Sequence, residues 1–341
     1  MTGTSLKIGV IGAGNIGTAM AALLSRSGAE VFLTARNERL RAVSDDGIRL
    51  NDRGDVIEVH PFASEVLPET MDAVFVCVKS QSLPTALLSN AEAIGPETLI
   101  IPMVNGMPFW FFATENEMGQ IPYLDPKGDL AKLLRPSQIL GAVLLMTVRM
   151  DESGQAISSN TPTLSIGTVA TGAHAEKIER LVATLEAGGV RTDLSDDIRQ
   201  KVLVKLLANL TTNPLTALTG ATLEAVGQTE MLREIATELA DEFRSWAKDN
   251  GYDLPSNEWL VDLFIEAGDF PTSMLQDALA GRALELDAIC RAPLELARRD
   301  GGDMPLLARL IADVETAARL PVSDVPAAIE RLANMTVYAR G

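Results

Sequence analysis

The chain has 341 residues, a formal net charge of −17 and two cysteines. This length allows two domains with substantial cores, and the negative charge argues against non-specific binding to nucleic acid or to anionic membranes. Cys77 and Cys290 lie far apart in apolar segments without metal-ligand spacing, so we expect neither a disulfide nor a metal site. No signal peptide and no apolar run of membrane-spanning length is visible, which predicts a cytoplasmic protein.

The first element, from Lys7 to Met20, is a short apolar strand that breaks into a glycine-rich turn and resumes as a helix. Gly12, Gly14 and Gly17 have the G-x-G-x-x-G spacing. The first glycine makes the tight turn, the second lets the backbone approach a pyrophosphate, and the third allows the helix to pack closely on the strand. The free N–H groups at the helix start favour phosphate. We therefore predict a dinucleotide site made by Gly12, Ala13, Gly14, Asn15, Ile16 and Gly17.

A second strand is predicted over residues 30–35, as a βαβ unit requires. An NAD-selective site usually has Asp or Glu after this strand to bind the ribose 2′-hydroxyl, whereas this chain has Ala35, Arg36 and Asn37. Arg36 is therefore a candidate for binding a 2′-phosphate, which predicts NADPH rather than NADH. The alternative is an ordinary solvated loop arginine.

Two further apolar runs, residues 73–79 and 98–104, are typical of strands buried on both faces of a parallel sheet. Lys79 ends the first run and Asn105 follows the second. Because open α/β sheets bind ligands at the carboxyl ends of their strands, both residues are candidates for binding cofactor or substrate. A lysine in such a position can equally be solvated without a function.

Residues 108–136 are predicted to be an insertion, and their aromatic run over 109–112 fits either packing against the sheet or the lining of a substrate pocket. Residues 139–150, a segment around Ile157 and residues 163–169 are predicted strands. A helix over residues 175–187 and a last strand over 190–193 follow.

The character of the chain changes after Ser195, which we expect to cap a helix that begins at Asp196. From there the sequence is almost wholly helical in period. We therefore predict an α/β fold with two domains, a Rossmann-like dinucleotide-binding domain over residues 1–195 and an all-helical domain over residues 196–341. The expected main helices of the second domain cover residues 221–247, 258–267, 274–280, 285–299 and 305–319.

Polar residues form a stripe on the first helix of this second domain. Lys205, Asn209 and Asn213 are four residues apart, which keeps them within about 80° of arc on a helix. Pro214 predicts a break or kink just after them. A lysine in a partly desolvated cleft can donate a proton to a carbonyl oxygen that becomes an alkoxide, and the amides can orient a substrate. Alternatively, Lys205 reaches solvent and the asparagines satisfy helix ends.

A second polar cluster lies further along the same domain. Ser273 is expected to cap a helix that starts at Met274, which leaves backbone N–H groups available to a carboxylate. Glu285 lies between Leu284 and Leu286. It is either part of a site or a surface residue of an amphipathic helix.

With these residues in view, the chain resembles the ketopantoate reductase (2-dehydropantoate 2-reductase) family nearly end to end. The resemblance rests on GAGNIG, on CVKS with Lys79, on VNG with Asn105, on KLLANLTTNPLTALTG, and on SMLQD followed at the family's spacing by Glu285. The combination is far more specific than any single motif.

The resemblance implies an NADPH-dependent reduction of 2-dehydropantoate to pantoate on the way to coenzyme A. It implies that Lys205 is the catalytic acid and that Lys79 and Asn105 span cofactor and substrate. The residues expected around the substrate are Asn105, Lys205, Asn209, Asn213, Ser273 and Glu285, with Glu285 counted beside Lys205 in the catalytic set.

Two departures from the family pattern concern the substrate rather than the hydride transfer. Pro108 stands where many members have a second glycine, and Leu223 occupies a region where many carry a polar residue. A different 2-oxo acid is therefore an alternative substrate. Two other hypotheses are an opine-type or hydroxy-acid dehydrogenase of the same architecture and a non-catalytic NADPH sensor, although a sensor has no need of a proton donor beside the nicotinamide. The expected partner is a small 2-oxo acid, and a helical domain rich in Leu and Ala is suited to a homodimer interface.

Overall fold

The structure, a computed structural model, describes residues 5–151, 153–171 and 174–317. The chain divides into two compact units. The first extends to Lys201 without residues 105–108, and these four residues belong to the second unit together with the chain from Val202 onward. The division falls inside helix α6 (Ile198–Thr219), whereas the sequence places the boundary before it, at Ser195.

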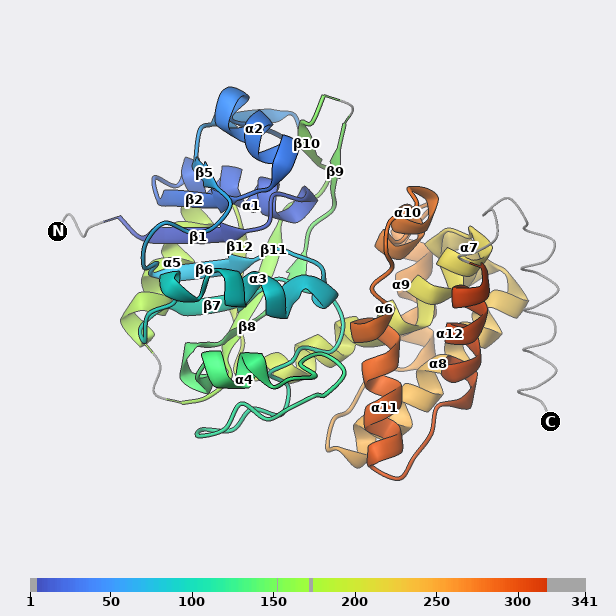
Figure 1. The fold of residues 1–341 in the computed structure, drawn as a ribbon. Helices are drawn as coiled ribbons and strands as arrows, with labels where there is room; N and C mark the ends of the chain where they lie inside the picture. Colours follow the sequence, from blue (N-terminus) through green and yellow to red (C-terminus); the bar gives the residue numbers. More distant parts are fainter. Residues whose placement is uncertain (1–4, 152, 172–173, 318–341) are drawn as a thin grey trace. The chain divides into compact units, whose positions relative to one another are not determined.

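The first unit is built on a five-stranded sheet in the order β5-β2-β1-β6-β7, in which every neighbouring pair is parallel (Figure 1). The strands are β1 (Lys7–Ile11), β2 (Glu30–Thr34), β5 (Phe62–Ser64), β6 (Ala73–Val76) and β7 (Leu99–Pro102). The helices that follow them are α1 (Asn15–Arg26), α2 (Asn37–Asp46), η1 (Ser80–Ser82), α3 (Leu83–Ser89) and η2 (Ala91–Ala93). The strand order reverses between β1 and β6, which confirms the predicted Rossmann-like fold class.

Two smaller sheets complete this unit, in the orders β4-β3-β10-β9 and β12-β11-β8. Their strands are β3 (Ile48–Asp52), β4 (Asp55–Val59), β8 (Leu140–Leu145), β9 (Val148–Met150), β10 (Ala156–Ser158), β11 (Thr163–Thr168) and β12 (Arg191–Leu194). The remaining helices are α4 (Asp129–Leu133), η3 (Pro136–Gln138) and α5 (Ala175–Ala187). The prediction of one strand over 139–150 is wrong, because the chain changes sheets between Leu145 and Val148.

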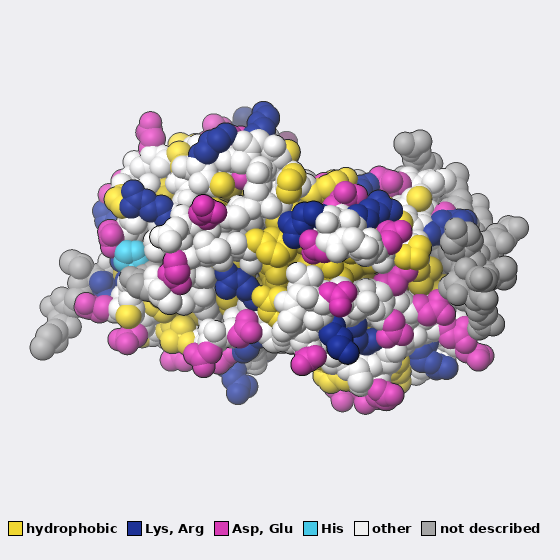
Figure 2. Space-filling model, turned by 90° about the horizontal axis from the view of Figure 1, so that it is seen from below, with side chains coloured by type: hydrophobic (Ala, Val, Ile, Leu, Met, Phe, Trp, Pro, Cys, Tyr) yellow, Lys and Arg dark blue, Asp and Glu magenta, His cyan; other side chains and the backbone are white. Residues whose placement is uncertain are grey.

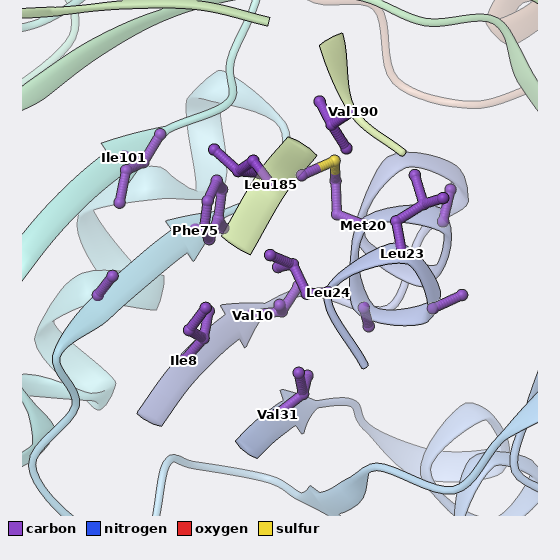
Figure 3. Packing of buried hydrophobic residues seen from close by; sticks show 14 of the residues in the cluster. Ile8, Val10, Met20, Leu23, Leu24, Val31, Phe75, Ile101, Leu185 and Val190 are labelled. Carbon is purple, nitrogen blue, oxygen red and sulfur yellow. The ribbon is translucent and has the colours of Figure 1, made fainter. Parts of the chain in front are cut away.

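Helix α1 lies at the centre of the first unit's core. Its residues from Gly17 to Leu24 are all buried, because the helix has sheet strands and α5 around it rather than one covered face. Figure 3 shows the aliphatic side chains of α1 packed with those of β1, β2 and α5. The aromatic run of the insertion is buried too, at Phe109, Trp110 and Phe111, which favours the packing interpretation of that run.

In the described part of the second unit, helices are joined by loops and there is no strand. Beyond α6 its helices are α7 (Leu223–Gln228), α8 (Glu230–Asp249), α9 (Asn257–Ala267), α10 (Ser273–Leu279), the π-helical η4 (Asp287–Arg291), α11 (Ala292–Arg299) and α12 (Pro305–Ala317). The single helix predicted over 221–247 is wrong, because Thr229 adopts an extended conformation between α7 and α8. The cap predicted at Ser195 is also wrong: Asp197 accepts the N–H of Gln200, and α6 begins at Ile198.

The surface agrees with the negative net charge. On the face shown in Figure 2, acidic side chains are widely spread among single basic ones, and the described residues form no continuous basic field there. Within the described ranges, no helix has both the length and the apolar composition needed to cross a membrane.

Candidate functional site

The three glycines of the first turn have different surroundings. Gly12 has φ +103°, and a Cβ atom there would lie 2.9 Å from the Cys77 carbonyl oxygen. A Cβ atom on Gly17 would lie 1.7 Å from the carbonyl oxygen of Gly12, so only glycine lets α1 pack so closely on the turn. At Gly14, a Cβ atom would meet no protein atom within 4 Å. Packing therefore does not require glycine at 14, which is consistent with the approach of a ligand.

Several polar contacts fix the shape of this turn. The N–H of Gly12 donates to Thr34 Oγ1 at 3.1 Å, and the Thr18 hydroxyl donates to the Ala13 carbonyl at 3.2 Å. Asn15 donates through Nδ2 to the Val148 carbonyl at 3.0 Å, so its side chain anchors β9 while its backbone begins α1. Of the other predicted turn residues, Ala13 and Ile16 are half-buried against the core.

A cavity of about 480 Å³ opens beside this turn, at the carboxyl ends of β1 and β2. Its lining combines the glycine turn, the residues after β2 and the helical segment after β6. The lining residues are Ile11, Gly12, Ala13, Thr34, Ala35, Arg36, Arg39, Glu65, Val78, Gln81, Ser82, Thr85, Ala86 and Asn90. Ligands of open α/β sheets bind at such strand ends, beside the point where strand order reverses.

Two arginines of α2 bring positive charge to the cavity. Arg36, the candidate for phosphate binding, is exposed and forms the N-cap of α2. Arg39 is half-buried, donates through Nε to the Ala13 carbonyl at 3.2 Å and through Nη2 to Thr18 Oγ1 at 2.9 Å. Burial lowers the pKa of the Arg39 guanidinium. The open approach at Gly14, the start of α1 and these cations together fit a dinucleotide that carries phosphates.

Lys79 lies three residues after the end of β6, is half-buried and forms the N-cap of η1. It is not among the residues that line the cavity. It belongs to the same unit as the glycine turn, whereas Asn105 belongs to the second unit.

Asn105 belongs with the second unit because the residues after it pack on the π-helical segment η4. The N–H of Met107 donates to the Ala288 carbonyl at 2.7 Å. A Cβ atom on Gly106, which has φ +92°, would lie 2.5 Å from the backbone of Ala288. The segment of Asn105 is thus fixed against the helix that begins just after Glu285.

In the second unit, α6 holds Lys205 in a half-buried position. Burial lowers the pKa of the Lys205 ammonium to about 8, and the negative charge of Glu285 opposes this shift. Glu285 is itself half-buried and precedes the first helical residue, Leu286. The alternative of an exposed Glu285 on the face of a helix is wrong, because Glu285 lies before the helix and its charge acts on Lys205.

The asparagines of α6 lie on the same face as Lys205, since they follow it at intervals of four residues. Asn213 is 3% exposed and Asn209 is half-buried. Among the described residues, neither side-chain amide has a hydrogen-bonding partner. A buried amide without a partner is costly, so its donors and acceptor are available to a bound molecule.

The break predicted at Pro214 does not occur, because α6 continues through it to Thr219. Pro214 has no N–H, so the Leu210 carbonyl lacks its usual helical donor. Buried threonine hydroxyls nearby instead donate to helix carbonyls: Thr211 to Leu207 at 2.9 Å and Thr212 to Ala208 at 2.6 Å.

The prediction that Ser273 caps the next helix is wrong by one residue. Thr272 is the N-cap and accepts the N–H of Leu275 at 3.2 Å, whereas Ser273 is the exposed first residue of α10. The Thr272 hydroxyl also lies 2.6 Å from that of Thr216, three residues after Asn213. The beginning of α10 is therefore tied to the helix that bears the asparagines.

Sequence reasoning missed three residues that shape these regions, namely Thr34, Arg39 and Thr272. A signal existed for each. Arg39 follows Arg36 at helical spacing, Thr34 ends a predicted strand, and Thr272 caps a helix as readily as the neighbouring serine. In the part of the chain that the structure describes, no group of acidic, histidine or cysteine side chains could hold a metal ion.

Comparisons with known proteins cover both units. The family model described as ketopantoate reductase PanE/ApbA matches residues 8–171, and that for the C-terminal part of ketopantoate reductase PanE/ApbA matches residues 197–317. A 2-dehydropantoate 2-reductase of Mesorhizobium japonicum is 31% identical over 323 residues, which are 92% of this chain and 98% of the relative.

Solved structures share the fold. A protein of Ralstonia solanacearum, named as a candidate ketopantoate reductase, is 26% identical with a TM-score of 0.85, over 93% of this chain and 98% of that protein. D-mandelate dehydrogenase, solved with NADH and anilino(oxo)acetate, is 20% identical with a TM-score of 0.80, over 92% of this chain and 98% of its own.

Proposed function

Because the chain belongs to the ketopantoate reductase family, we propose that it reduces 2-dehydropantoate to pantoate with NADPH, a step in the synthesis of coenzyme A. Membership confirms the resemblance drawn from the sequence motifs. It also makes the chain an oxidoreductase that acts on CH–OH groups and uses a nicotinamide dinucleotide. The choice of 2-oxo acid, the preference for NADPH and the roles of single residues form the proposal.

The observation that carries the proposal is the half-buried position of Lys205 near Glu285, with the lowered pKa that follows from it. An ammonium with its pKa lowered to about 8 is still mostly protonated at neutral pH but gives up its proton readily. General acid catalysis is most efficient when the pKa of the donor lies near the working pH. The half-buried position of Lys205 and the opposing charge of Glu285 produce that value together.

The residues of the second unit have distinct tasks in this reaction. The bound cofactor supplies a hydride for the keto carbon. Lys205 Nζ polarises the keto oxygen and then donates its proton to it. The amides of Asn209 and Asn213 orient the substrate, and Glu285 accepts a hydrogen bond from the substrate hydroxyl while its charge keeps Lys205 protonated. Asn105 and Ser273 complete the set that we assign to the substrate.

The first unit supports NADPH over NADH. The three residues directly after β2 include no Asp or Glu, which an NAD site usually has there, and Arg36 is one of them, at the rim of the cavity. The pyrophosphate is assigned to the turn from Gly12 to Gly17, and Lys79 to the part of the cofactor nearer the reaction. Replacement of Arg36 by Ala should lower the preference for NADPH over NADH.

The proposed function is tested by NADPH oxidation with a panel of 2-oxo acids. The panel contains 2-dehydropantoate, pyruvate, 2-oxoisovalerate and phenylglyoxylate, the last because of the structural neighbour named D-mandelate dehydrogenase. We expect the highest kcat/KM with 2-dehydropantoate. A higher value with another acid would replace the substrate but keep the reaction class. Tight NADPH binding without turnover on any acid would instead indicate a sensor.

A further inference from the structure

We propose that Arg39, more than Arg36, recognises the 2′-phosphate of the cofactor, because its guanidinium is held rigidly by the glycine turn at the edge of the cavity. The inference rests on the proposed NADPH dependence and names the residue that produces it. Arg36 is the obvious candidate from sequence, but the structure distinguishes the two arginines by their contacts and their burial.

The contacts of Arg39 fix its position without using up its donors. A guanidinium has five N–H groups, and two of them reach the Ala13 carbonyl and the Thr18 hydroxyl. Thr18 is fully buried, so this anchor is itself rigid. The three remaining donors face no hydrogen-bond acceptor among the described residues, while the residue lines the cavity. A phosphate has the oxygen atoms that such a fork of donors binds.

Within the described residues, the positive charge of Arg39 is not balanced by a paired carboxylate. No carboxylate of the described residues forms an ion pair with it, although its burial makes a bare positive charge unfavourable. Glu65 is the acidic residue among those that line the cavity, and it is exposed. With Arg36 and Arg39 present, the lining has more positive than negative charge. A half-buried cation without a counter-ion, beside a cavity, is suited to an anionic ligand.

The two arginines should therefore contribute unequally. Arg36 is exposed at the N-cap of α2, where water screens its attraction for a phosphate. Arg39 is half-buried and its side chain is already ordered, so binding costs less conformational entropy and the attraction is less screened. Its contact with the Ala13 carbonyl also links the 2′-phosphate to the turn that we assign to the pyrophosphate.

The test compares two ligands that share adenosine and a 5′-phosphate. Isothermal titration calorimetry on the full chain measures the affinity for AMP and for 2′,5′-ADP, which adds the 2′-phosphate. For Arg39→Ala we expect the affinity for 2′,5′-ADP to fall about 10-fold to 100-fold, as expected for a lost charge-assisted hydrogen bond. For Arg36→Ala we expect a fall of about 2-fold to 5-fold. The affinity of both variants for AMP should stay within about 3-fold of the original.

Two further variants keep the test decisive. Arg41→Ala removes an exposed arginine of the same helix that does not line the cavity, and it should leave both affinities unchanged. Arg39→Lys keeps a positive charge but cannot reach both anchors, so it should lose affinity for 2′,5′-ADP selectively and only in part. It serves in place of Arg39→Ala if that variant does not fold.

Three outcomes would overturn the inference. An equal loss of AMP and 2′,5′-ADP affinity in the Arg39 variants would mean that Arg39 only shapes the glycine turn. A retained preference for 2′,5′-ADP in Arg39→Ala would exclude Arg39 and leave NADPH dependence intact. If the unchanged protein binds AMP and 2′,5′-ADP equally well, the NADPH part of the proposed function fails as well.

Discussion

The glycine turn of the first unit and the Lys205 region of the second (Lys205, Asn209, Asn213 and Glu285), both proposed above as ligand sites, are built from opposite kinds of chemical group. The turn uses backbone groups, and its shape depends on where side chains are absent, at Gly12, Gly14 and Gly17. The Lys205 region uses side chains that are expensive to bury, namely the ammonium of Lys205 and the amide of Asn213, for which the described residues offer no hydrogen-bonding partner. The difference predicts how each region responds to mutation.

In the first region, a few neighbouring residues determine the shape of the turn. A substitution there should therefore change stability or cofactor affinity by changing that shape. In the second, the chain supplies Asn105, Lys205 and Glu285 from distant positions, and the fold of one unit brings their segments together. A substitution there should act through charge and proton transfer, with little effect on shape. Experiments that separate stability, cofactor affinity and turnover can therefore test the contrast directly.

The largest effect is expected from Lys205→Ala. If Lys205 is the proton donor, its removal should lower kcat by about 100-fold to 1000-fold, as the loss of one group that stabilises developing charge typically does. The affinity for NADPH should change little, because Lys205 is not among the residues assigned to the cofactor and the glycine turn belongs to the other unit. Steady-state kinetics and calorimetry measure the two quantities.

Lys201→Ala is the matched control for this experiment. Lys201 lies one turn earlier on α6 and forms an ion pair with Asp193, so it tests whether loss of any lysine of this helix slows the enzyme. We expect kcat to stay within about 2-fold of the original value, as for a surface ion pair. Equal turnover by Lys205→Ala and the unchanged protein would remove Lys205 from the mechanism.

A second pair of variants tests the backbone design of the first region. In Gly17→Ala the new Cβ atom would overlap the Gly12 carbonyl oxygen at 1.7 Å, so we expect a loss of about 1–3 kcal/mol in the free energy of unfolding. In Gly14→Ala the new atom meets no protein atom, so stability should be retained while NADPH affinity falls at least about 10-fold.

Urea unfolding and calorimetry distinguish these two responses. Full NADPH affinity in Gly14→Ala would show that the pyrophosphate does not approach the backbone there. Unchanged stability in Gly17→Ala would show that the turn can move apart without cost, which would contradict the tight packing of α1.

The pH dependence of turnover tests the charge design of the second region. With a pKa of about 8, Lys205 loses its proton above that pH, so kcat/KM for reduction should fall about 10-fold for each further pH unit. Oxidation of pantoate needs the neutral amine as a base and should speed up over the same interval. In Glu285→Gln the opposing negative charge is absent, so the fall should begin at lower pH.

The same shift has a consequence for stability. Between pH 8 and pH 10.5 the unfolded chain binds a proton at Lys205 that the folded protein has lost. The contribution of Lys205 to the free energy of unfolding should therefore rise with pH across this window, and Lys205→Met should abolish that rise.

For turnover, a rate of reduction that stays constant up to pH 10 would contradict the assignment of Lys205 as the proton donor.

The strand, turn and helix of the first region could be predicted almost completely from the sequence, because local patterns determine them. The glycine spacing, the strand before it and Arg36 after the next strand lie within about thirty residues. Arg39 was missed there, because its contacts with Ala13 and Thr18 follow from the fold and belong to no motif. The strand predicted over 139–150 failed because a continuous apolar pattern does not reveal a change of sheet.

The second region was predictable only in part. Spacing placed Lys205, Asn209 and Asn213 on one helix face, but the connection with Glu285 came from a resemblance and not from periodicity. The helix cap was misplaced at Ser273, because Ser and Thr are almost equal as N-caps and their order in the chain gives no preference. The fold decides for Thr272 through its contact with Thr216.

The smallest effect is expected at that hydroxyl pair. The Thr272 hydroxyl contacts that of Thr216 at 2.6 Å and also accepts the N–H of Leu275 at 3.2 Å. Thr272→Val removes both the hydroxyl contact and the cap, and it should lower the free energy of unfolding by about 1–2 kcal/mol. Thr272→Ser keeps both contacts and should cost less.

Thr237→Val provides the comparison that isolates this tie between α10 and α6. Its hydroxyl donates within α8 to the Arg233 carbonyl at 2.9 Å, so its loss costs one hydrogen bond without separating two helices. If the tie also holds the polar stripe in place, Thr272→Val should raise KM for the 2-oxo acid about 3-fold while Thr237→Val leaves it unchanged. Equal losses of stability and unchanged KM in both variants would mean that the positions of Lys205, Asn209 and Asn213 do not depend on α10 and are set by α6 itself.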